Sequence, residues 1–67
     1  MKKEFAKNLR HFRQLKGISQ SELANKLGTT QRRISYFELG KIEPDIDTLC
    51  RIAKFFDVSV DELLGEI

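Results

Sequence analysis

The sequence has few of the residues that cross-link small proteins. Its 67 residues include one cysteine, one histidine, one proline and no tryptophan. Cys50 alone cannot form an internal disulfide, and Cys50 with His11 supplies too few ligands for a structural zinc site. No apolar run approaches the roughly 20 residues of a membrane-spanning helix, and the start of the chain lacks the apolar segment of a signal peptide. We therefore expect one domain over residues 1–67, without metal or cofactor, in the reducing cytoplasm.

The charged residues that are present divide unevenly along the chain. Residues 1–41 contain ten lysines and arginines and three acidic residues, a net charge of +7, whereas residues 42–67 contain two and seven, a net charge of −5. This division indicates that the amino-terminal part faces a polyanion and that the carboxy-terminal part faces away from it. A solvated helical protein can show the same division by chance, so charge alone does not identify the partner.

Glycines and capping residues divide the chain into helices. Each glycine follows a stretch of helical periodicity, and we expect each to end its helix in the left-handed conformation; these are Gly17, Gly28, Gly40 and Gly65. Ser19 and Ser59 each precede a glutamate by three residues, the pattern of a capping box. Thr30 and Asp45 are expected to cap two further helices, and Asp57 to replace a terminal glycine.

These signals predict five helices, at residues 2–16, 20–27, 31–38, 46–56 and 60–64. Apolar residues recur at helical spacing of three and four in the first and fourth of them, as in Phe5, Leu9 and Phe12. We see no strand-like alternation, so the fold class is all-α. Cys50 is expected to be small and partly buried, and His11 to be solvated.

Residues 20–39 carry the most informative spacing. Ala24 provides a small residue where a second helix can cross the first, and Gly28 provides a turn residue tolerant of positive φ. Ile34 and Phe37 are then spaced to face the first helix. This combination predicts a helix-turn-helix, although a plain helical hairpin with Gly28 as its cap fits the spacing as well.

The run from Leu9 to Leu64 resembles the phage lambda-repressor-like, Cro-type family of helix-turn-helix domains. The resemblance rests on Phe12–Arg13, Ile18–Ser19–Gln20, Leu23–Ala24, Leu27–Gly28, Ile34–Ser35, Phe37–Glu38, Gly40–Lys41, Pro44, Leu49, Ile52–Ala53 and the run from Val58 to Leu64. It implies a compact five-helix domain whose third helix enters the DNA major groove. It also implies a partly buried salt bridge between Arg13 and Glu38, and a phosphate contact from Gln20.

Helical projection of residues 31–38 predicts which side chains face DNA. With Ile34 and Phe37 directed inward, the outward arc and the helix start are expected to contact bases through Gln31, Arg32, Ser35 and Tyr36. Arginines usually lie on solvated faces, but this face also carries an aromatic ring and no acid, which favours DNA contact by Arg32. Tyr36 can alternatively contact a sugar or a phosphate.

Phosphate contacts are expected near the starts of the second and third helices, where free N–H groups favour anions. The candidates are Gln20, Thr29, Thr30, Arg33 and Lys41. Two residues depart from the family pattern, because Leu39 and Glu43 stand where polar or basic residues are common. Glu43 would repel phosphate, and Leu39 can contact either a thymine methyl group or a protein.

These features predict a sequence-specific transcriptional regulator, expected to be a repressor, that binds double-stranded DNA as a homodimer on a palindromic operator. Candidate dimer contacts are Val60, Leu64, Ile67, Leu39 and Ile42. The alternative is a protein-interaction module, such as an antitoxin or adaptor, built on the same fold. An enzyme is not expected, because the sequence lacks paired carboxylates with a cleft, an activated nucleophile and a phosphate-cradling glycine loop. A chain this small also leaves little room for a ligand pocket.

Overall fold

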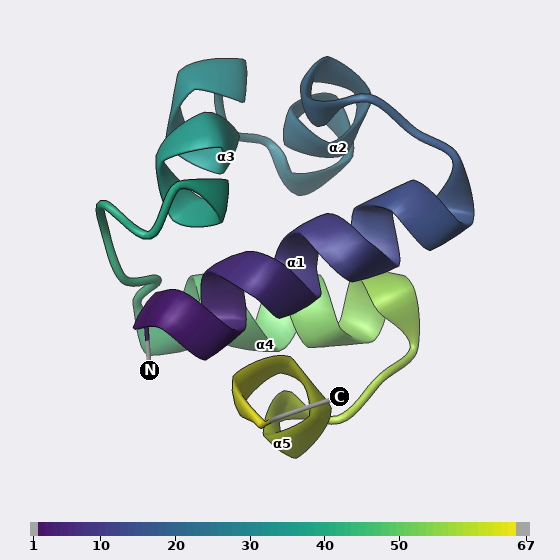
Figure 1. The fold of residues 1–67 in the computed structure, drawn as a ribbon. Coiled ribbons are helices and arrows are strands. Elements are labelled where there is room, and N and C mark those ends of the chain that lie inside the picture. Colours follow the sequence, from purple (N-terminus) through teal and green to yellow (C-terminus); the bar gives the residue numbers. More distant parts are fainter. Residues whose placement is uncertain (1, 66–67) are drawn as a thin grey trace.

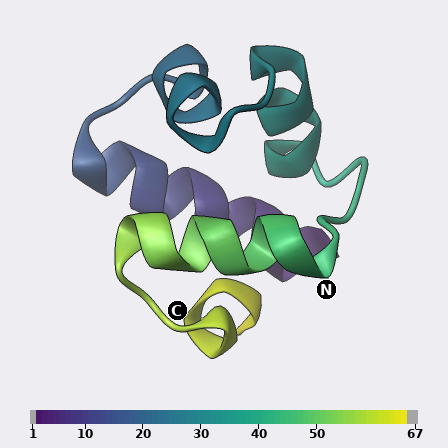
Figure 2. The same ribbon diagram turned by 180° about the vertical axis from the view of Figure 1, so that it is seen from behind.

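The computed structural model describes residues 2–65 and has five helices in that range. They are α1 (Lys2–Lys16), α2 (Gln20–Leu27), α3 (Gln31–Glu38), α4 (Ile46–Phe56) and α5 (Val60–Leu64). Their bounds coincide with the expected ones, and the all-α class is confirmed. Helices α1 and α4 cross the middle of the molecule, with α2 and α3 on one side and α5 on the other (Figures 1 and 2).

Local capping explains most of these bounds. Ser19 and Ser59 form the expected capping boxes with Glu22 and Glu62, and the Thr30 hydroxyl accepts a hydrogen bond from the backbone N–H of Arg33. Asp57 ends α4 in the left-handed conformation at φ 57°. Each cap supplies a partner for backbone groups that the helix itself leaves unpaired, so the chain can start and stop helices with few distant contacts.

Two caps differ from expectation in part. Asp45 is the N-cap residue of α4, as expected, but its side chain makes no capping hydrogen bond; its Oδ1 accepts from the Thr48 hydroxyl and from Arg33. Gly65 follows α5 with φ −95°, outside the left-handed region, so the expected left-handed end is wrong there. The backbone oxygen of Gly65 instead accepts a hydrogen bond from Asn8, on α1.

The core draws on every helix. The large side chains with no solvent exposure are Phe5, Leu9, Leu23, Ile34, Phe37, Ile52 and Leu63. The rings of Phe5 and Phe37 meet edge to face at 5.6 Å between centroids, which fixes α1 against α3. Cys50, on α4, is exposed, so the expectation that it is partly buried is wrong. No helix among residues 2–65 is long and apolar enough to span a membrane.

Asn8 is the one buried polar side chain of the described core, with 1% exposure. Its Nδ2 donates to the backbone oxygens of Glu62, Leu63 and Gly65 at the end of α5. The carbonyl groups at a helix end have no partner within the helix, and burying them unpaired is costly. Asn8 therefore supplies the carboxy-terminal cap of α5 from α1.

Replacing Asn8 tests this cap. Asn8→Ala leaves the end of α5 without its donor, and we expect the free energy of unfolding to fall by about 1–3 kcal/mol, the cost of a buried unsatisfied group. Urea unfolding followed by circular dichroism measures the change. Gln14→Ala, on the exposed face of the same helix, is the matched control and should change stability by less than about 0.5 kcal/mol. Equal effects of the two substitutions would show that Asn8 caps nothing of consequence.

Candidate nucleic-acid interface

The turn between α2 and α3 has the geometry that the sequence predicts. Gly28 adopts the left-handed conformation with φ 69°, and Ala24, with 3% exposure, belongs to the core cluster that α2 and α3 share. Ile34 and Phe37 are buried in one cluster with Leu23 and Leu27. A hydrogen bond that sequence reasoning missed reaches this turn from α4, where Arg51 donates to the backbone oxygen of Leu27. Helices α2 and α3 are thus packed as a helix-turn-helix, and Arg51 on α4 holds the turn through this hydrogen bond.

The side chains proposed to contact bases share one surface of α3. Gln31 and Arg32 are exposed, and Ser35 and Tyr36 are partly exposed. Leu39 follows α3 with 63% exposure. The inward face of α3 belongs to Ile34 and Phe37, so the division between core and solvent agrees with the helical projection.

A buried ion pair lies behind this surface. Arg13 Nε is 2.6 Å from Glu38 Oε2, and Arg13 also donates to Glu38 Oε1 at 3.1 Å and to the backbone oxygen of Ile18 at 2.8 Å. The side chains are 14% and 4% exposed. The hydrogen bonds to Glu38 raise the pKa of Arg13, because they stabilise the charged guanidinium against the cost of burial. The pair joins α1 to the end of α3.

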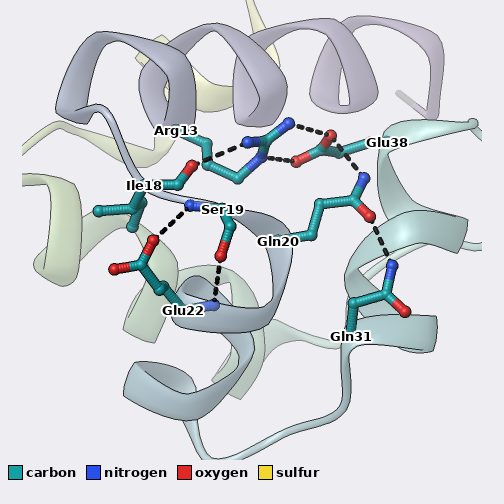
Figure 3. A network of polar contacts seen from close by, with 7 residues as sticks. All are labelled: Arg13, Ile18, Ser19, Gln20, Glu22, Gln31 and Glu38. Atoms are coloured by element: carbon teal, nitrogen blue, oxygen red, sulfur yellow. Dashed lines mark hydrogen bonds and ion pairs between the residues drawn. The ribbon is translucent and has the colours of Figure 1, made fainter.

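A chain of hydrogen bonds connects this ion pair to the start of α3 (Figure 3). Gln20 Nε2 donates to Glu38 Oε1 at 3.0 Å, and Gln31 Nε2 donates to Gln20 Oε1 at 2.7 Å. Sequence reasoning assigned these residues to separate roles and missed their connection. Their positions could have indicated this contact. Gln20 and Gln31 are the first residues of α2 and α3, and a helix-turn-helix brings these two helix starts together.

The donors and acceptors in this series of hydrogen bonds fix the orientation of the side-chain amides of Gln20 and Gln31. An ionised carboxylate only accepts hydrogen bonds, so Gln20 must turn its NH₂ group towards Glu38. Its carbonyl oxygen then faces Gln31, which must in turn present its own NH₂ group. Gln31 keeps one amide hydrogen and its carbonyl oxygen for a further partner. This donor and acceptor pair matches the N7 and N6 groups of adenine.

Arg32, Tyr36 and Lys41 form a second cluster on the outer surface. Arg32 Nε donates to the Tyr36 hydroxyl at 3.1 Å, and the guanidinium carbon lies 5.5 Å from the centre of the ring. Lys41 Nζ lies 5.6 Å from the same ring. Both distances lie in the range of cation–π attraction. One aromatic ring therefore connects two cations near the exposed end of α3.

The other candidates for phosphate contact differ in their surroundings. Arg33 is turned towards the start of α4, where its Nη2 lies 3.1 Å from Asp45 Oδ1 and its guanidinium lies over the Phe37 ring. The Thr48 hydroxyl, and to a lesser extent Arg33, lower the pKa of Asp45. Thr29 is partly buried in the turn and Thr30 is exposed at the cap of α3, whereas Lys41 is exposed beyond it.

A groove of about 930 Å³ lies between α1 and the end of α3. Its wall on α1 includes Lys3, Lys7 and Arg10, and its other wall includes Leu39 and Glu43. The expectation that so small a chain leaves little room for a pocket is therefore wrong. Ala6 on α1 and Gly40, which follows α3 with φ 72°, also line this groove.

Comparison with known proteins gives this geometry a context. The family model described as helix-turn-helix matches residues 9–63. The HTH-type transcriptional regulator YqaE of Bacillus subtilis is 43% identical over 60 residues, which is 90% of this chain and 52% of that protein. The transcriptional activator BcrR of Enterococcus faecalis is 41% identical over 62 residues, 92% of this chain and 30% of that protein. The chain thus spans about half the length of YqaE, and less of BcrR.

Solved structures give the same result. The hypothetical transcription factor NHTF from Neisseria matches with a TM-score of 0.88 and 30% identity over 96% of this chain and 74% of that chain. The restriction-modification controller protein C.AhdI from Aeromonas hydrophila matches with a TM-score of 0.84 and 27% identity over 92% and 90%. These relatives are named regulators and not enzymes. The chain belongs to the Cro/C1-type helix-turn-helix family of transcriptional regulators.

Proposed function

We propose that this chain binds double-stranded DNA with α3 in the major groove, and that it acts as a repressor by binding a palindromic operator as a homodimer. The observation that carries the proposal is the outward orientation of Gln31, which the contacts from Glu38 through Gln20 impose. An amide held in one orientation can distinguish adenine from the other bases, because its donor and acceptor cannot exchange places. A solvated helix face needs no such support.

The remaining side chains take roles that their positions suit. Arg32, Ser35 and Tyr36 contact bases beside Gln31, and Thr29, Thr30 and Lys41 contact the phosphate backbone together with Gln20. Arg33 also contacts phosphate in this proposal, once DNA competes with Asp45 for its guanidinium; the pair is exposed and therefore weak. Arg13 and Glu38 hold the surface in place from behind.

The proposed dimer follows from the size of the recognition surface. One α3 reads few base pairs, and two copies on half-sites about 10 base pairs apart read twice as many. Among the candidate contacts, Val60, Leu64 and Ile42 pack against the core as partly buried residues, whereas Leu39 is exposed. Ile67 lies outside the described residues. Selection of bound sites from random DNA, with the mass of the complex measured, tests operator and stoichiometry together.

The groove beside Leu39 favours one alternative, a protein-interaction module such as an antitoxin or adaptor. Its exposed leucine and basic wall would suit an acidic protein segment. Salt titration separates the two functions, since DNA binding weakens steeply as salt rises. If no DNA sequence is selected and a protein partner binds without strong salt dependence, the DNA proposal is refuted.

Substitutions of Arg32 and Lys41 separate base contact from phosphate contact. Arg32→Ala should cost about 1–3 kcal/mol on the selected site and relax base preference at one position. Lys41→Ala should weaken all sequences alike and reduce the salt slope by about 1. Fluorescence anisotropy at several salt concentrations measures both. Lys54→Ala, on α4, is the matched control and should leave affinity and slope unchanged; an unchanged base preference in Arg32→Ala would refute the assignment of α3.

Substitution of Gln20 tests the support of Gln31. Gln20→Ala should weaken binding by about 1 kcal/mol, the net value of a hydrogen bond, and should lower the preference for adenine at the position that Gln31 reads. The loss should be smaller when Gln31 is already alanine, because the two residues then no longer act together. Affinities for operators with each base at that position give the result. Gln14→Ala is the control, and independent losses from Gln20→Ala and Gln31→Ala would contradict the connection.

A further inference from the structure

The cluster around Tyr36 contains a contact that a base-reading role of Tyr36 does not require. The phenol hydroxyl accepts a hydrogen bond from Arg32 Nε at 3.1 Å, between residues one helical turn apart on α3. The guanidinium carbon also lies over the ring, 5.5 Å from its centre. Two interactions of different kinds thus hold one exposed arginine against one aromatic side chain.

The nitrogen of Arg32 that contacts Tyr36 determines which N–H groups remain for DNA. A guanidinium carries five N–H groups, and Tyr36 engages the single one at Nε. The terminal nitrogens Nη1 and Nη2 together form a planar fork that matches the O6 and N7 acceptors of guanine. A free arginine loses side-chain entropy when it is ordered. In this chain Tyr36 already restricts the side chain before DNA arrives.

We infer that Tyr36 is a positioning residue, which presents the terminal nitrogens of Arg32 to a guanine in the operator half-site. The inference rests on the proposed function and makes it more specific, since it names a base and the device that selects it. Lys41, which follows α3 in the chain, also contacts Tyr36, with its Nζ 5.6 Å from the centre of the ring. The ring therefore lies between a base-reading cation and a cation suited to phosphate.

The hydroxyl, and not the ring, is the part of Tyr36 that orients Arg32. Tyr36→Phe keeps the ring and the cation–π contacts and removes only the oxygen that accepts from Nε. We expect this variant to bind the selected operator about two- to tenfold more weakly, the range that a net hydrogen bond of 0.5–1.5 kcal/mol gives. The preference for guanine over adenine at the Arg32 position should fall by a similar factor.

A double-mutant cycle tests whether Tyr36 acts through Arg32. In the Arg32→Ala background, Tyr36→Phe should have no further effect on affinity or base preference, because the group that the hydroxyl positions is gone and the ring, which makes the base contact of Tyr36, is kept. Ser35→Ala, which removes a neighbouring hydroxyl on α3, is the matched control and should cause the same loss in both backgrounds. All five variants, the two double ones included, are measured as full chains, and the free energy of unfolding checks that each one folds.

A second measurement needs no DNA. The Nε–H proton of Arg32 should exchange slowly with water in the free protein and give a resolved NMR signal, which Tyr36→Phe should broaden or remove. Rapid exchange in both proteins would overturn the inference, and so would an equal loss of affinity from Tyr36→Phe in both backgrounds. A chain that selects no DNA sequence refutes the proposed function itself, whereas a selected operator with no guanine at the Arg32 position refutes only this inference.

Discussion

The surface of α3 depends on the ion pair between Arg13 and Glu38. Both side chains are nearly removed from solvent, where a charge without a partner costs several kcal/mol. Here every charged group has partners, because Glu38 accepts from Arg13 and Gln20, and Arg13 also donates to Ile18. The pair is stable in one arrangement of α1, α2 and α3, and that arrangement places α3 with its polar face outward.

The same ion pair also fixes the orientation of the exposed Gln31 amide, because of which groups can donate and which can accept hydrogen bonds. A carboxylate accepts only, so each glutamine in sequence must donate with its nitrogen and accept with its oxygen. The rule would reverse if Glu38 were a donor, and Gln31 would then present its groups to DNA in the opposite order. A buried acid thus determines the orientation of the Gln31 amide, with Gln20 between them in the hydrogen-bonded chain.

Features that depend on contacts between residues near in sequence could be predicted, whereas features that depend on contacts between distant residues could not. Helix bounds depend on caps such as Ser19 and Thr30, which bond to residues three positions away, so they were predictable. The end of α5 differs from expectation at Gly65, which Asn8 contacts from α1. The burial of individual residues, such as Cys50, and the bond between Gln20 and Gln31 likewise depend on how helices pack, which capping and periodicity do not specify.

The recognition surface therefore has two supports that differ in kind. Gln31 is held from the core, so its orientation depends on the packing of α1 against α3. Arg32 is held within α3 by Tyr36, one turn away, and needs no contact with the rest of the domain. The two neighbouring arginines have different partners. Arg33 pairs with Asp45 at the start of α4, whereas Arg32 contacts Tyr36 on α3. Of two adjacent cations with the same chemistry, the fold thus leaves Arg32 on the outer surface of α3 and turns Arg33 towards α4.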